Sequence, residues 1–107
     1  MTPENVSAVI DTVKGTVLPS ERIAMFNKAC AIDPHDTVVI EELSELIKAV
    51  SKINRCHNNE HLKSLMEEIA DVRIVIERIM RKYNIKEDDI DKLVVFKINR
   101  FIDRYGI

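Results

Sequence analysis

Two pairs of acidic residues have the types and the spacing to bind a metal ion. Residues 42–45 read Glu-Leu-Ser-Glu, and residues 68–71 read Glu-Ile-Ala-Asp. In a helix, residues three apart lie one turn from each other on the same face, so each pair would present two carboxylates together. Hard divalent ions prefer oxygen ligands, and Mg²⁺ usually keeps several water positions that phosphate oxygens can take. Together, the four acids predict a magnesium site suited to phosphate chemistry.

Four carboxylates in one place would repel one another and raise each other's pKa values unless a cation were bound. The metal would neutralise phosphate charge, orient the attacking water and lower its pKa. Such positioning and electrostatics do almost all the work in phosphoryl chemistry. The plain alternative is that acids three apart form a solvated helix face. Glu41, Glu67 and Glu68 would then serve solubility only.

Apolar spacing predicts the helices that must position these acids. Residues at i, i+3, i+4 and i+7 indicate one helix from about Thr37 to Asn54, a second from Asn59 to about Asn84, and a third from about Glu87. The expected apolar stripes are Val39, Leu43, Leu46, Ile47 and Val50; then Leu62, Leu65, Ile69, Val72, Ile76, Ile79 and Tyr83; then Ile90, Leu93, Val94, Ile98, Phe101 and Ile102.

The acids are predicted to flank these stripes. At roughly 100° per residue, Glu42 lies about 80° and Glu45 about 140° from the centre of its stripe. The corresponding angles are about 70° for Glu68 and about 130° for Asp71. If the two helices pack antiparallel, as short connections favour, the four carboxylates can converge beside the core. The predicted fold is all-α, an antiparallel helical bundle forming one domain over residues 1–107.

A further helical region is predicted over about residues 3–31, with an interruption near residues 15–20 because Gly15 and Pro19 fall there. One kinked helix and two separate helices both fit this pattern. Asp36 or Thr37 is the expected N-cap of the helix over 37–54, and Asn59 that of the next helix.

The composition restricts the function. The chain has 16 basic and 18 acidic residues, which is too balanced for a general binder of nucleic-acid polymers. Its longest apolar runs are about four residues, so no membrane span is expected. The N-terminus carries Glu4 and Asp11 and does not read as a secretory signal. Cys30 and Cys56 are expected to be free thiols, and the expected location is the cytoplasm.

The acidic pairs and their neighbours resemble the MazG-type nucleotide pyrophosphohydrolases. Glu42-x-x-Glu45, then 22 residues, then Glu68-x-x-Asp71 is similar to that family's motif, and the likeness runs from about Asp36 to Arg104. It looks closest to the compact MazG-like proteins of phages and bacteria. The resemblance implies a helical homodimer or homotetramer of the all-α NTP pyrophosphatase type. It implies that the four acids bind Mg²⁺, or Mn²⁺ as a substitute, and that one of them activates the attacking water.

The implied reaction is hydrolysis of a nucleoside or deoxynucleoside triphosphate between the α and β phosphates. The products are a monophosphate and pyrophosphate, which would serve nucleotide-pool control or house-cleaning. The family's last helix carries bases that meet the phosphates, and Lys97, Arg100 and Arg104 share one face there. The spacing departs from the K-x-x-x-N-x-x-R form of some relatives, because Lys97 is only two residues before Asn99. Lys52 and Arg55 could also reach a phosphate, although an exposed surface role fits them as well.

Other functions fit the sequence less well. A non-catalytic helical interaction or regulatory module is the main alternative. His57 and His61 lack a third ligand at helical spacing, so zinc is disfavoured. A di-iron bundle would need Glu-x-x-His pairs, which neither acidic motif provides. With only two glycines, the chain has no phosphate-binding Gly-rich loop. Apolar residues such as Met25, Phe26 and Tyr83 are more typical of a core than of a base pocket.

Overall fold

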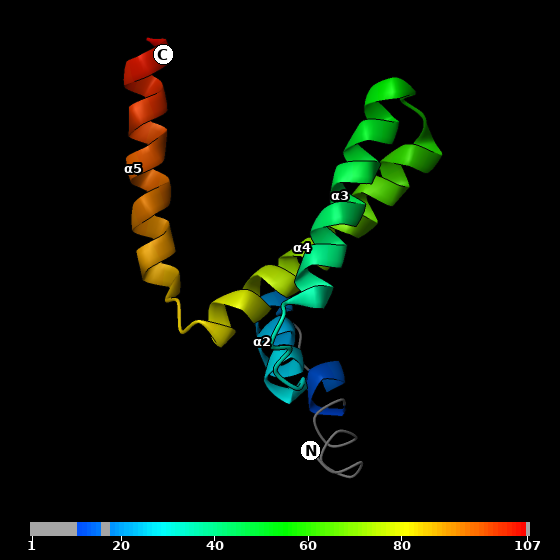
Figure 1. Ribbon diagram of the computed structural model, residues 1–107, viewed down its shortest axis with the longest axis vertical. Coiled ribbons are helices and arrows are strands. Elements are labelled where there is room, and N and C mark those ends of the chain that lie inside the picture. Colours follow the sequence, from blue (N-terminus) through cyan, green and yellow to red (C-terminus); the bar gives the residue numbers. More distant parts are fainter. Residues whose placement is uncertain (1–10, 16–17, 107) are drawn as a thin grey trace.

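The computed structural model describes residues 11–15 and 18–106, and its regular elements in these ranges are all helices. They are α2 (Pro19–Ala29), α3 (Thr37–Arg55), α4 (Asn59–Lys82) and α5 (Glu87–Tyr105), while residues 11–15 are also helical (Figure 1). The all-α prediction is confirmed. Most of the helix predicted from Pro3 lies outside the described residues, but the interruption before Glu21 is present, because residue 18 is not helical. No helix in the described part is long and apolar enough to cross a membrane.

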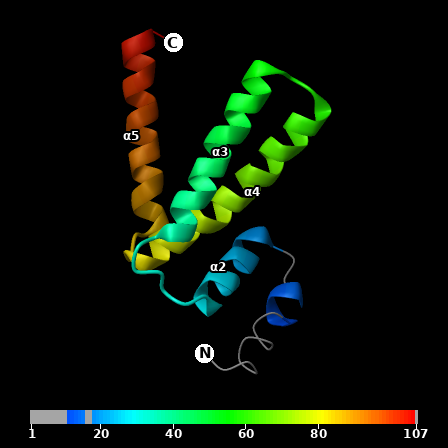
Figure 2. The same cartoon turned by 45° about the vertical axis from the view of Figure 1, so that its right-hand side comes forward.

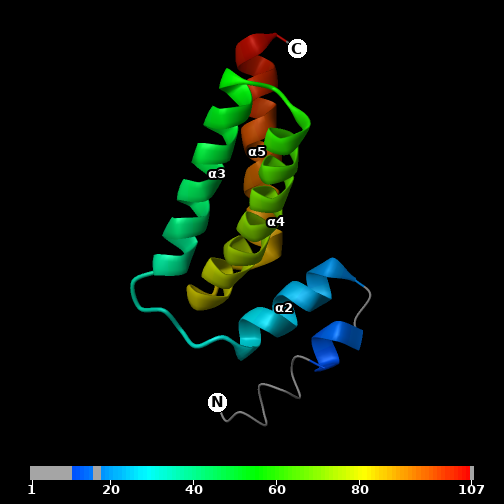
Figure 3. The ribbon, with the colours of Figure 1, turned by 90° about the vertical axis from the view of Figure 1, so that its right-hand side faces the viewer.

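Helices α3 and α4 form an antiparallel hairpin that contains most of the core (Figures 1 and 3). Val39 and Ala49 of α3 and Val75 of α4 are buried, and Val75 keeps only 2% of its surface exposed. Half-buried apolar residues complete the contact: Leu46 and Ile53 on α3, and Leu65, Val72 and Ile79 on α4. Helix α2 packs against α4 alone, and among the described elements α5 packs against none (Figure 2).

The apolar residues of α3 form two lines along the helix, whereas the sequence analysis predicted a single stripe. Val39 and Leu46 face α4, but Leu43, Ile47 and Val50 stay exposed in the single chain. The prediction that all five face one core is therefore wrong. The two lines lie about 100° apart around the helix, so one neighbouring helix covers only one of them.

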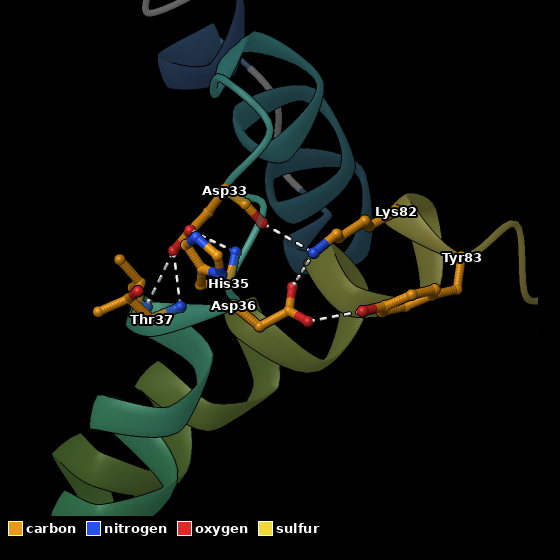
Figure 4. A network of polar contacts seen from close by, with 7 residues as sticks. Asp33, His35, Asp36, Thr37, Lys82 and Tyr83 are labelled. Atoms are coloured by element: carbon orange, nitrogen blue, oxygen red, sulfur yellow. Dashed lines mark hydrogen bonds and ion pairs between the residues drawn. The ribbon is translucent and has the colours of Figure 1, made fainter.

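The sequence predicted Asp36 or Thr37 as the N-cap of α3, but the side chain that caps this helix is that of Asp33. The Asp33 carboxylate accepts hydrogen bonds from the backbone N–H groups of Thr37 (2.7 Å), Val38 (3.4 Å) and His35 (3.0 Å) (Figure 4). These hydrogen bonds lower the pKa of Asp33. Asp36 occupies the N-cap position with a left-handed backbone, φ 52°, and makes no side-chain cap.

The Asp36 side chain instead connects the start of α3 to the end of α4. Lys82 donates to Asp36 Oδ1 (2.7 Å) and to the backbone oxygen of Asp33 (2.8 Å), while the Tyr83 hydroxyl donates to Asp36 Oδ2 (2.7 Å) (Figure 4). Hydrogen bonds from Lys82 and Tyr83 lower the pKa of Asp36. This network closes the open end of the hairpin.

The N-cap of α4 is Asn58, one residue before the predicted Asn59. Its side-chain oxygen accepts from the His61 backbone N–H at 2.7 Å. We expect Asn58→Ala to lower the free energy of unfolding by about 1 kcal/mol, because one N-terminal donor of α4 loses its partner. Asn59→Ala is the matched control and should change stability much less. Urea unfolding of the two variants measures the difference, and an equal loss in both would contradict this cap.

A Schellman motif ends α4 and sets the direction of the chain toward α5. Asn84 has a left-handed backbone with φ 53°. The Ile85 N–H bonds to the Met80 oxygen (2.8 Å), and the Asn84 N–H to the Arg81 oxygen (3.3 Å). This pair of bonds is the standard helix stop with a left-handed residue just beyond the C-cap. The connection to α5 is thus hydrogen-bonded and short.

Candidate metal centre

Three of the four predicted acids converge where α3 meets α4. Glu42, Glu68 and Asp71 each offer a carboxylate oxygen, and the three oxygens lie within 4.8 Å of one another. Glu42 lies in the line of α3 residues that faces α4, one turn after Val39 and one before Leu46, so its carboxylate is directed into the helix contact. The two-helix geometry therefore brings acids from different chain segments into one cluster.

Burial and mutual repulsion both favour protonation of this cluster. Burial raises the pKa of Glu42, and the negative charges of Asp71 and Glu68 raise it further. Burial also raises the pKa of Glu68, with added repulsion from Asp71 and Glu45. A bound cation would remove this cost, because it favours the ionised form of every carboxylate around it.

One oxygen of the cluster is buried without a hydrogen-bond partner. Glu68 Oε2 is the one buried side-chain oxygen or nitrogen without a partner among residues 11–15 and 18–106. Buried polar groups nearly always have a partner, so an unpaired oxygen here is typical of a site that can take a cation or a water. A carboxylate-only set with an unpaired oxygen fits a hard divalent cation such as Mg²⁺.

Glu45 is the acid that the structure does not bring into the cluster. Its exposed carboxylate pairs with Lys48, one turn further along α3, at 3.3 Å. Its charge still acts on the site, since it raises the pKa values of Glu42 and Glu68. Lys48 was not singled out in the sequence, although its i, i+3 spacing from Glu45 is the signal for such a pair.

Compared with protein-family models, curated proteins and solved structures, the chain matches none. The likeness to MazG-type enzymes therefore depends on the motif residues alone. Within the structure, the feature relevant to this likeness is the meeting of Glu42, Glu68 and Asp71.

The predicted phosphate-binding residues lie apart from the acids in the single chain. Lys97, Arg100 and Arg104 line a hollow of about 110 Å³ on α5 together with Phe101. Helix α5 does not pack against α3 or α4, so the structure does not bring these bases to the acid cluster. Lys52 and Arg55 are exposed in the last turn of α3, and Lys52 is two turns beyond Glu45.

A second polar region, between α2 and α4, was not predicted. Asn27 is 4% exposed, donates to the Ile74 backbone oxygen (2.8 Å) and to Glu77, and accepts from Arg78 Nε (3.0 Å). Arg78 also donates to Cys30 Sγ at 3.4 Å. A neighbouring cavity of about 240 Å³ includes Arg78, Arg81 and Lys82, each of which has a hydrogen-bond partner. These contacts fix α2 on α4.

Histidines and cysteines form no comparable cluster in the part of the chain that the structure describes. The acidic triad is the one group of three or more candidate ligands found there. His61 Nδ1 lies 2.6 Å from the Cys56 backbone oxygen, and both cysteines are free thiols.

The raised pKa values give the stability of the metal-free protein a definite pH dependence. Above the ordinary value of 4.5, native Glu42 and Glu68 bind more protons than they do in the unfolded chain. Stability should therefore fall as the pH rises from 4.5 through their raised pKa values. The lowered pKa values of Asp33 and Asp36 have the opposite effect, because stability is lost as the pH falls, but this effect appears only below their ordinary pKa of 3.8.

Thermal melts in EDTA between about pH 5 and about pH 7 test this dependence. The midpoint should decrease toward neutral pH, and added Mg²⁺ should flatten the slope. Glu42→Gln should also flatten it, because a titrating member of the cluster is gone. A midpoint that rises with pH across this range would contradict the proposed electrostatics.

Proposed function

We propose that this protein is a Mg²⁺-dependent nucleoside triphosphate pyrophosphohydrolase, which acts on nucleoside or deoxynucleoside triphosphates. The observation that carries the proposal is the meeting of Glu42, Glu68 and Asp71 within 4.8 Å, with Glu68 Oε2 buried and unpaired. A cluster with that much uncompensated negative charge is a poor structural element and a good cation site. The motif likeness to MazG-type enzymes supports the same reaction.

Glu42, Glu68 and Asp71 would hold the metal, and Glu45 could join them if its carboxylate leaves Lys48. Bound there, Mg²⁺ would neutralise phosphate charge and lower the pKa of the attacking water. A carboxylate of the same cluster would accept the water proton as the new oxygen–phosphorus bond forms at the α phosphate. The bond from that phosphorus to the bridging oxygen breaks, and pyrophosphate leaves with the electron pair.

A panel of nucleoside tri- and diphosphates with Mg²⁺ tests the reaction. Triphosphates should give monophosphate and pyrophosphate in equal amounts, and EDTA should abolish turnover. In ¹⁸O-water the label should enter the monophosphate, because the proposed attack is at the α phosphorus. Release of orthophosphate with a diphosphate product, or label found only in pyrophosphate, would exclude this cleavage.

A second candidate, a non-catalytic helical interaction module, is favoured by the exposed apolar residues of α3, α4 and α5. In that case the acids would be a solvated feature and a partner helix would be the ligand. Calorimetry with Mg²⁺ and a non-hydrolysable triphosphate separates the two. Binding of both supports the enzyme, whereas binding of neither supports the interaction module.

A further inference from the structure

Glu45 is the predicted metal ligand that stays outside the acid cluster, and Lys48 is the residue that pairs with it. The Lys48 ammonium lies 3.3 Å from Glu45 Oε1, one turn further along α3. Both side chains face water, since 64% of the Lys48 side chain and 50% of the Glu45 side chain are exposed. In the metal-free protein, Glu45 therefore has a cation from its own helix as its partner.

This ion pair is loose in comparison with the one at the closed end of the hairpin. Lys82 and Asp36 lie 2.7 Å apart, their side chains are only 18% and 20% exposed, and Lys82 has a second acceptor in the Asp33 backbone oxygen. Exposed pairs such as Glu45–Lys48 favour the paired state by no more than about fivefold. Glu45 can therefore leave Lys48 at little cost.

The Glu45 carboxylate is close enough to the cluster to act on it. Its negative charge contributes to the raised pKa values of Glu42 and Glu68. Glu45 and Asp71 are each displaced by about 80° from the line of their helix that faces the other helix, in the same rotational sense. Because α3 and α4 are antiparallel (Figure 3), both carboxylates lie on one side of the hairpin. Glu45 thus lies beside the cluster, on its solvent side.

A divalent cation at the cluster would be a stronger partner for Glu45 than Lys48 is. At the same separation, an ion with two charges attracts a carboxylate about twice as strongly as an ammonium group does. Carboxylate oxygens are also the protein ligands that Mg²⁺ prefers. Rotation of the Glu45 side chain toward the cluster would break only the one loose contact with Lys48.

The departure of Glu45 would leave a free ammonium group beside the metal site. Lysine binds phosphate as a point charge on a flexible stem, so it does not need a fixed orientation beforehand. The hairpin has a use for such a group, because the structure does not bring the bases of α5 to the acids. Lys48 is on the same helix as Glu42 and Glu45, and it therefore stays near them whatever the position of α5.

We propose that Lys48 couples metal binding to phosphate binding: Glu45 leaves Lys48 for the metal, and the freed ammonium group then binds the phosphate chain of the substrate. Lys48 thus weakens the binding of the metal alone and strengthens the binding of phosphate once the metal is present. Each ligand then raises the affinity of the other. The inference rests on the proposed function, since it requires that the cluster binds Mg²⁺, and it adds to that function a positioning residue and its coupling.

Calorimetric titration of the metal-free protein with Mg²⁺ tests the first half of the proposal. Lys48→Met keeps a long, unbranched side chain with good helix propensity and removes only the charge. It should tighten Mg²⁺ binding by about two- to fivefold, because Glu45 no longer has to leave a partner. Lys63→Met is the matched control, since it removes the same charge from an exposed position on α4. It should leave the Mg²⁺ affinity unchanged.

A double-mutant cycle separates competition for Glu45 from simple repulsion between Lys48 and the ion. If Lys48 competes for Glu45, Lys48→Met should no longer tighten Mg²⁺ binding when Glu45 is already replaced by glutamine. If Lys48 only repels the ion, the gain should be the same with and without Glu45→Gln. An equal gain in both backgrounds would overturn the proposal.

Titration with methylenediphosphonate in excess Mg²⁺ tests the second half. This pyrophosphate mimic is not hydrolysed and carries no base, so it reports phosphate binding alone. Lys48→Met should weaken its binding by about tenfold, because one charge-assisted hydrogen bond is lost. The variant should therefore bind the metal more tightly and the phosphate mimic less tightly, and general damage to α3 would not produce opposite changes.

The outcomes separate this inference from the proposed function. If the wild-type protein binds Mg²⁺ but Lys48→Met leaves either affinity unchanged, the coupling by Lys48 is wrong and the metal site remains. If the wild-type protein binds no Mg²⁺, the proposed function is wrong and this inference fails with it. Circular dichroism of each variant checks that its helices are intact.

Discussion

Replacing Glu42 with glutamine is expected to reduce pyrophosphate release by more than about 100-fold while making the metal-free protein more stable. Groups that only support a metal ligand commonly contribute 10- to 100-fold to affinity or activity, so loss of a ligand charge should exceed that range. The same substitution removes one of the charges that repel Glu68 and Asp71. Activity and stability should thus change in opposite directions, which a simply unfolded variant would not show.

Steady-state assays and thermal melts in EDTA measure the two effects. Asp71→Asn should behave like Glu42→Gln. The control is Glu41→Gln, which makes the same chemical change at an exposed neighbour outside the cluster. Unchanged turnover in both Glu42→Gln and Asp71→Asn would remove the proposed site. A loss of activity in Glu41→Gln of the same size would show that the assay reports general damage to α3.

Val75→Asp is expected to unfold most of the protein. Val75 is 2% exposed in the contact between α3 and α4, so an aspartate at this position would be buried among apolar side chains. An isolated carboxylate in such a place costs several kcal/mol or forces the helices apart. Domains of this size have only about 5–15 kcal/mol of stability in total, so little would remain.

Lys63→Asp is the control for Val75→Asp, because it places the same side chain on an exposed position of α4. We expect near-wild-type urea unfolding for the control and a loss of most cooperative helicity for Val75→Asp. If Val75→Asp unfolded at the wild-type urea concentration, the α3–α4 contact would not be the core of the fold.

The helices themselves were predictable because their apolar spacing is strong. Helix α5 begins at Glu87, as the acidic first turn indicated, and α3 ends one residue beyond the predicted Asn54. The caps were less predictable, since Asp33, Asp36 and Thr37 all have suitable side chains. Asp33 caps the helix because Asp36 has a left-handed backbone and because the Asp36 carboxylate accepts a hydrogen bond from Lys82 instead. Lys82 is 46 residues away, so local sequence holds no sign of it.

Three of the four acids meet as the spacing predicted, but their positions around the helix were misjudged. Glu42 was expected beside the core stripe and instead lies in the line facing α4. The predicted centre of the stripe was wrong because the five residues used to place it belong to two separate lines. Glu45 was expected with the other acids and pairs with Lys48, a competitor on its own helix. Sequence spacing shows which residues share a face, but it does not show which face meets a neighbour. For the same reason the sequence could not show that the apolar stripe of α5 stays exposed in the single chain.

The two faces of the hairpin leave α3 little tolerance for a change in its length. One inserted residue after Glu45 would rotate everything beyond it by about 100°. Leu46 would move into the exposed line of Leu43 and Ile47, and Lys52 would take the place of Ile53 in the line that faces α4. Glu42 and Glu68 could then meet only if the second half of α3 turned its apolar residues away from α4. A substitution in α3 changes one side chain, whereas an insertion would disturb the acid cluster and both apolar lines together.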